Sequence, residues 1–189
     1  MIDTLCKQAV EETAAVACFY FDFAAQEGQS PDAILGSVLK QIVGGLDEVP
    51  EGIVEDFRRR GRVVSSQKLV RSEIMEYLKV IVSSRPTFIC LDAVDEYPDR
   101  YRVELLDLLN QILEKAPGTR LFLTGRPQIR SEVEEHLAER AATRPITAAK
   151  NDIVTFLRAK LKEDTMPEAM NKSLEEEIIQ KIPETVSEM

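Results

Sequence analysis

Hydrophobic residues recur along the chain in two alternating patterns, one typical of short buried strands and one of amphipathic helices. The strand pattern is a continuous apolar run rich in β-branched and aromatic residues. The helix pattern repeats every three to four residues, as in Ile34, Val38 and Ile42. The predicted strands are residues 15–23, 87–92, 119–127 and 144–149. The predicted helices are residues 2–13, 31–44, 51–60, 66–83, 102–115, 152–163 and 173–182.

Turn and cap residues set the predicted ends of several helices. Ser30 stands where an N-cap is expected, and Pro31 follows at the first helical position, where its missing N–H costs nothing. Gly44-Gly45 ends the same helix. Asn151 is predicted to cap the helix over 152–163 in the same way as Ser30.

Strands that alternate with amphipathic helices predict right-handed crossovers and a mostly parallel sheet, which is an α/β fold. In such sheets, ligands bind outside the carboxyl ends of the strands. The residues that follow each strand are therefore the first candidates for a functional site.

Composition narrows the class of protein. The 189 residues suit one domain, and a net charge of −9 with a pI near 4.8 argues against nucleic acid as a partner. No apolar run is long enough to span a bilayer, and the first residues lack the basic flank and apolar stretch of a signal peptide. The three cysteines are widely spaced, which favours reduced thiols in a cytoplasmic protein. A single histidine makes a histidine-based metal site or a Ser-His-Asp triad improbable.

Acidic residues gather where the predicted strand at 87–92 ends. Asp92, Asp95 and Glu96 follow an apolar run, and a Thr-Gly-Arg cluster at 124–126 follows the next strand. A carboxylate at the tip of a buried strand is desolvated unless a positive group meets it. Magnesium is the usual candidate, because this cation is held by one or two carboxylates together with substrate phosphates.

Two other interpretations of the acids remain open. They can form an acidic loop before the helix that begins near Tyr101, where the helix dipole stabilises negative charge. Alternatively, a small α/β enzyme unrelated to nucleotides can use them with a metal.

Four segments resemble one known family, in the family's order and over nearly the whole chain. "FICLDAVDEY" (88–97) resembles the Walker B block of NACHT domains, which we place at 87–96, and "RLFLTGRP" (120–127) is similar to their sensor 1 strand. "AVACFYFDFAAQEGQSPDAILGSVLKQI" resembles their second strand and following helix. "NDIVTFLRAKL" resembles the helix after the fifth strand, at the start of a helical extension over 151–189. The resemblance points to the STAND class of P-loop NTPases, in the nephrocystin-like subgroup abundant in fungal NOD-like receptors.

This resemblance implies a three-layer parallel sheet of P-loop NTPase type and a set of site residues. Asp92 would hold the magnesium ion, and Asp92 and Thr124 would together bind the cofactor. Asp95 and Glu96 would face the attacking water, and Arg126 would be the sensor arginine, so these three would be catalytic. The implied function is an ATP- or GTP-dependent switch module in intracellular signal transduction and innate immunity. Its partners would be an upstream effector and downstream repeats of the same parent protein.

The sequence departs from the family in one respect. It contains no Gly-Lys-Ser or Gly-Lys-Thr, the residues with which a P-loop cradles phosphates. The family's order places that motif before residue 1, which predicts a fragment that lacks the P-loop strand and is inactive alone. Whether the chain is an enzyme is therefore open, and a protein-interaction scaffold with a degenerate nucleotide site is the alternative. Without the P-loop strand, the strand at 120–127 should lack one neighbour, which predicts self-association.

Overall fold

A computed structural model describes residues 14–22, 29–61, 69–137, 140–163 and 171–187. The chain divides into two compact units, residues 1–142 and residues 143–189. Each unit is described by itself. The helix predicted at 2–13 lies outside the described residues, as do the first residues of the helix predicted at 66–83.

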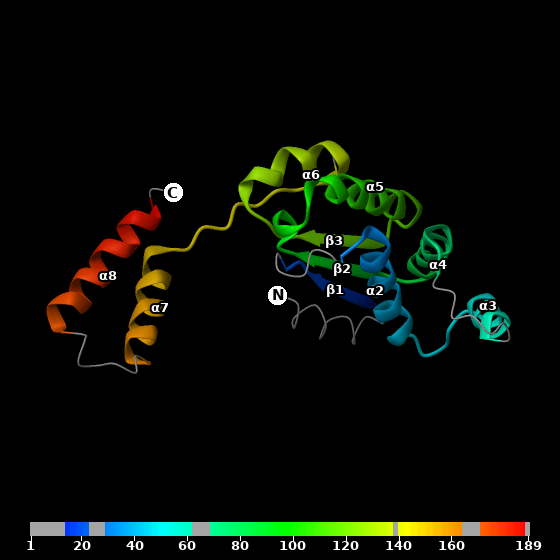
Figure 1. Cartoon of the computed structure of the whole chain (residues 1–189), viewed down its shortest axis with the longest axis horizontal. Helices are drawn as coiled ribbons and strands as arrows, with labels where there is room; N and C mark the ends of the chain where they lie inside the picture. Colours follow the sequence, from blue (N-terminus) through cyan, green and yellow to red (C-terminus); the bar gives the residue numbers. More distant parts are fainter. Residues whose placement is uncertain (1–13, 23–28, 62–68, 138–139, 164–170, 188–189) are drawn as a thin grey trace. The chain divides into compact units, whose positions relative to one another are not determined.

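Three parallel strands form the sheet of the first unit (Figure 1). They are β1 (Ala15–Tyr20), β2 (Thr87–Asp92) and β3 (Thr119–Leu123). Their order in the sheet follows the sequence, so β2 lies in the centre and β1 and β3 form the edges. The predictions of an α/β fold and of a parallel sheet are confirmed.

Three helices pack against one face of this sheet. They are α2 (Pro31–Gly44), α4 (Arg71–Ser84) and α5 (Asp99–Lys115). The apolar core lies between them and the strand residues that point toward them. The strand residues of this core are Ala15, Ala17, Ile89 and Leu91, with Phe19, Leu121 and Leu123 packed against it. Alternation along a strand turns the intervening residues to the other face.

The shorter elements of the first unit connect or flank these helices. They are α3 (Glu51–Gly61), α6 (Arg130–Leu137) and two 3₁₀ turns, η2 (Val94–Glu96) and η3 (Pro127–Ile129). The turns η2 and η3 directly follow β2 and β3, and α6 packs against α5. The turns η2 and η3 therefore lie at the carboxyl ends of β2 and β3.

The cap predicted at Ser30 is confirmed, because its hydroxyl accepts a hydrogen bond from the amide of Ala33 at 3.2 Å. The helix predicted at 102–115 begins earlier, at Asp99, and the strand predicted at 15–23 ends at Tyr20. Among the described residues, no helix is long and apolar enough to cross a membrane.

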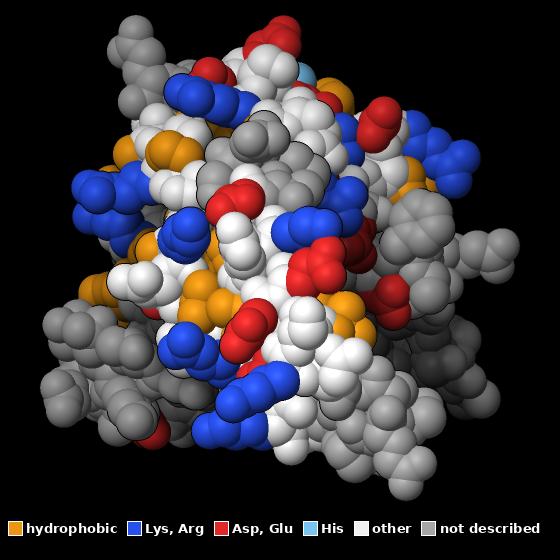
Figure 2. Space-filling view, turned by 90° about the vertical axis from the view of Figure 1, so that its left-hand side faces the viewer, with side chains coloured by type: hydrophobic (Ala, Val, Ile, Leu, Met, Phe, Trp, Pro, Cys, Tyr) orange, Lys and Arg blue, Asp and Glu red, His pale blue; other side chains and the backbone are white. Residues whose placement is uncertain are grey.

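The second unit contains two helices that pack against each other, α7 (Lys150–Lys162) and α8 (Lys172–Ser187). The strand predicted at 144–149 is wrong: these residues form neither helix nor strand, and Ile146 is 94% exposed. The cap predicted at Asn151 is also wrong, because α7 begins at Lys150, two residues before its predicted start, and Ala149 occupies the cap position. On the face drawn in Figure 2, basic and acidic side chains are interspersed, with small apolar patches between them.

Candidate functional site

The loop after β2 makes a sharp turn that brings its backbone to the end of β3. Ala93 has φ 58° and ψ 45°, a left-handed conformation that costs an L-residue with a Cβ about 1 kcal/mol. Two hydrogen bonds to Thr124 fix this turn: the amide of Ala93 donates to Thr124 Oγ1 at 3.0 Å, and the amide of Val94 donates to the Thr124 carbonyl at 2.9 Å. A strained backbone conformation persists only where the surrounding structure holds it in place. Such conformations are common at functional sites.

Thr124 joins the ends of the two strands through every polar group that it has. Its amide donates to the carbonyl of Leu91 at 3.0 Å, which continues the ladder between β2 and β3. Its hydroxyl donates to the carboxylate of Asp92 and at the same time accepts the amide of Ala93. Thr124 and Asp92, both predicted as cofactor-binding residues, are therefore in direct contact.

Asp95 and Arg126 form a second pair beside the first. The amide of Arg126 donates to Asp95 Oδ1 at 3.1 Å, and the guanidinium Nε lies 3.4 Å from Asp95 Oδ2. The two side chains differ in exposure, because that of Asp95 is 6% exposed and that of Arg126 is 72% exposed. The buried carboxylate thus anchors the loop after β3, while the guanidinium reaches into solvent.

Gly125 permits the close approach of these two loops. A Cβ at this position would lie 2.6 Å from Ile129 Cδ1 and 3.2 Å from Asp95 Oδ1. The first distance is too short for a real Cβ, so the end of the Ile129 side chain would have to move, and the second would require Asp95 to give way slightly. Glu96, the remaining predicted residue, is half-buried in η2 next to Asp95.

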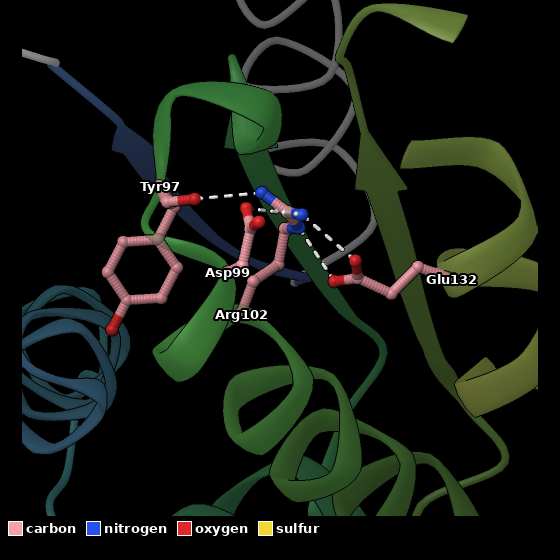
Figure 3. Close-up of polar contacts among 4 residues, drawn as sticks. All are labelled: Tyr97, Asp99, Arg102 and Glu132. Carbon is pink, nitrogen blue, oxygen red and sulfur yellow. Dashed lines mark hydrogen bonds and ion pairs between the residues drawn. The ribbon is translucent and has the colours of Figure 1, made fainter. Parts of the chain in front are cut away.

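Behind the two loops, a buried arginine that the sequence analysis did not identify ties three elements together (Figure 3). Arg102 of α5 has a side chain only 7% exposed. Its guanidinium donates to both carboxylate oxygens of Glu132 in α6, at 2.6 and 2.9 Å. It also donates to the Tyr97 carbonyl at 2.8 Å and to Asp99 Oδ1 at 2.9 Å. Hydrogen bonding to Glu132 raises the pKa of Arg102 above its ordinary value.

Arg102 therefore holds the end of the acid loop and the helix that follows the Arg126 loop at a fixed distance from each other. A signal for this role is present in the sequence. Arg102 stands three residues before Leu105 and seven before Leu109, on the same apolar stripe of its helix. A charged residue on a buried stripe requires partners.

A second charged cluster joins the three packed helices. Arg71 of α4 contacts the carboxylates of Asp32 in α2 and Glu104 in α5, each of which is partly exposed. The hydrogen bond to Asp32 is the main cause that raises the pKa of Arg71. Partial exposure to water keeps the energetic contribution of such pairs small.

The Tyr97 hydroxyl is buried nearby and has no hydrogen-bond partner among the residues that the structure describes. Burial raises the pKa of Tyr97 well above its ordinary value, because the low-polarity surroundings penalise the phenolate. Its ring packs against Phe21 with centroids 4.7 Å apart and against Tyr101 at 6.1 Å. The Tyr97 side chain thus packs in the core, while the Tyr97 backbone carbonyl accepts a hydrogen bond from Arg102.

The donor set at the strand ends suits a magnesium ion that also binds phosphate. Asp92 and Thr124 offer hard oxygen ligands, which magnesium prefers. No group of three or more metal-binding side chains occurs within the described ranges. Asp92 and Thr124 would supply only part of the ligand set of such an ion.

Three comparisons relate the chain to known proteins. A family model described as Nephrocystin 3, N-terminal, matches residues 1–126. A search of curated proteins found no match. Among solved structures, the Walker-type ATPase PABY2304 of Pyrococcus abyssi aligns with 98% of this chain and 64% of its own, at 14% identity and a TM-score of 0.44. The chain thus spans less than two thirds of that ATPase.

Proposed function

Because the chain belongs to the Nephrocystin 3 N-terminal family, we propose that it forms part of an ATP- or GTP-dependent regulatory switch in a NOD-like signalling protein. The observation that carries the proposal is the meeting of Asp92, Asp95, Thr124 and Arg126 at the carboxyl ends of neighbouring parallel strands. Ligands bind at this edge in open α/β sheets.

In this proposal, Asp92 and Thr124 hold a magnesium ion together with the phosphates of the nucleotide. The ion supplies charge that neutralises the phosphates, and the two side chains fix its place at the end of β2. Glu96 and Asp95 are the acids that face the attacking water, which is the role that the NACHT resemblance implies.

Arg126 is the residue that senses the phosphate. Its guanidinium is largely exposed and bound to Asp95 by a single 3.4 Å contact, so it can turn toward a phosphate while its backbone amide stays on Asp95. A guanidinium can form two parallel hydrogen bonds with a phosphate, whereas its contact with Asp95 is a single pair at 3.4 Å. Movement of this side chain couples the nucleotide to η3 and α6, which follow it in the chain.

A scaffold with a degenerate nucleotide site is the second candidate, and one observation favours it. Asp92 and Asp95 already accept hydrogen bonds from Thr124 and Arg126, so each has a structural role without any ligand. In that case the parent protein would use this unit only to bind its own effector and repeats, or another copy.

Nucleotide binding separates these candidates. A longer product of the same gene that carries a Gly-Lys-Ser or Gly-Lys-Thr loop should bind magnesium-ATP or magnesium-GTP in a calorimetric titration. Asp92→Asn and Arg126→Ala should each lower its hydrolysis about 10²-fold, the scale expected when one preorganised electrostatic partner is lost.

Arg130→Ala is the matched control for this experiment. Arg130 lies four residues after Arg126, is exposed and pairs with Glu134 of its own helix. Its removal should leave hydrolysis unchanged. If the long product binds neither nucleotide, the scaffold replaces the switch. If Asp92→Asn retains full turnover, the assignment of the magnesium site is wrong.

A further inference from the structure

Two cysteines lie side by side on the central and outer strands of the sheet. Cys18 of β1 and Cys90 of β2 are register partners, and both sulfurs are thiols in the structure. Neighbouring strands are about 4.8 Å apart, and the Cα atoms of a disulfide are about 4.4–6.8 Å apart. The register therefore places the two backbones within bonding range of a disulfide.

Both side chains point to the face of the sheet opposite the helical core. Their neighbours in sequence, Ala17 and Ile89, point into that core, and alternation turns the cysteines away from it. Cys90 is 4% exposed, whereas Cys18 is partly exposed. An oxidant from solvent therefore reaches Cys18 first, and Cys90 lies beside it.

The position of Cys18 is fixed by a side chain that replaces a neighbouring strand. The amide of Cys18 donates to Gln41 Oε1 at 2.9 Å, and Gln41 Nε2 donates to the Cys18 carbonyl at 2.8 Å. On its other side, β1 pairs with β2 along its whole length. The backbone at Cys18 is thus held from both sides, which keeps the two cysteines in register.

We propose that Cys18 and Cys90 form a redox-sensitive pair that hydrogen peroxide converts into a disulfide between β1 and β2. Peroxide oxidises the Cys18 thiol to a sulfenic acid and is itself reduced to water. The Cys90 sulfur then attacks the Cys18 sulfur, the new S–S bond forms, and the sulfenic oxygen leaves as a second water molecule. Both steps balance without any other oxidant.

The disulfide acts on the strand that carries the acid loop, because Cys90 stands two residues before Asp92. In-register residues of parallel strands project their side chains in the same direction, so the sulfurs must be drawn together to bond. Disulfides formed under such constraint are easily reduced, which is typical of reversible regulatory pairs. Oxidation of the pair would therefore change the position of β2 and of the acid loop after it, whether or not nucleotide is bound.

The test uses the full chain, reduced and then treated with increasing hydrogen peroxide, followed by thiol counting and peptide mapping without reductant. The folded chain should lose two of its three thiols and yield a peptide linked through Cys18 and Cys90. Dithiothreitol should restore both thiols. The Cys6→Ser variant keeps both partners and should give the same linked peptide.

The unfolded chain supplies the matched control. In urea, closing the short loop between Cys6 and Cys18 is easier than closing the long loop to Cys90, so the Cys6 linkage should predominate. A Cys18–Cys90 linkage in buffer and a different one in urea would support the proposal. A linkage through Cys6 in buffer, a linkage between two chains, or oxidation of Cys18 to a sulfinic acid with no linkage would each overturn it.

Discussion

Removing the carboxylate of Glu132 should destabilise the first unit far more than removing that of Glu134, two residues later in the same helix. Glu132 receives two hydrogen bonds from Arg102, whose side chain is 7% exposed, and is itself 22% exposed. Glu134 pairs with Arg130, and these side chains are 45% and 60% exposed. The two glutamates thus differ in how far they and their arginine partners are buried.

The magnitude follows from the partners that Arg102 keeps. After Glu132→Ala, its guanidinium still donates to the Tyr97 carbonyl and to Asp99, so the charge is not wholly unpaired. Loss of hydrogen bonds to a charged, buried group should lower the free energy of unfolding by about 1.5–3 kcal/mol. The Glu134→Ala variant loses an exposed i,i+4 pair with Arg130, and such a pair contributes about 0.3–0.5 kcal/mol.

Urea unfolding followed by far-UV circular dichroism measures both values, since the chain has no tryptophan to report by fluorescence. The denaturant slopes of the variants should match that of the natural chain, so that a shift in midpoint reports stability. Equal losses for Glu132→Ala and Glu134→Ala would refute the inference that Arg102 joins the two loops through Glu132.

Two further predictions concern a buried hydroxyl and an open strand edge. Tyr97→Phe should raise the free energy of unfolding by about 1 kcal/mol, because it removes a buried hydroxyl with no partner among the described residues. Since burial raises the pKa of Tyr97 in the folded chain, the natural chain should also lose stability above about pH 10, and the variant should lose less. The chain should self-associate at low micromolar concentration through β3, and Leu121→Pro, which removes an outward N–H, should abolish this in sedimentation velocity. A monodisperse natural chain would contradict the last prediction.

Local patterns predicted the elements of the first unit because the signals lie within each segment. The apolar runs of β2 and β3, and the cap and proline at Ser30 and Pro31, need no knowledge of the rest of the chain. The position of Asp92 and Thr124 at adjacent strand ends also followed, because parallel strands end at the same edge of a sheet. Topology therefore brought together side chains distant in sequence.

Contacts between helices could not be predicted in this way. Nothing local indicates that Arg102 meets Glu132, because this contact depends on how α5 and α6 pack. The strand predicted at 144–149 failed for a related reason, since a strand needs a neighbour to pair with its backbone. Pro145 removes one donor, and Ile146 has no apolar surface to cover it among the described residues.

The two edges of the sheet differ, and this difference links the nucleotide proposal to the prediction of self-association. Gln41 occupies the outer side of β1 with two hydrogen bonds, whereas no described strand pairs with the outer side of β3. If a larger protein adds a parallel strand at that edge, the carboxyl end of this strand would lie beside Arg126. A phosphate-binding loop that follows the strand would then place the phosphate within reach of the Arg126 guanidinium. A second copy at the same edge would exclude that strand. Nucleotide binding and association through β3 should therefore be alternatives: a product that binds nucleotide should no longer associate through this edge.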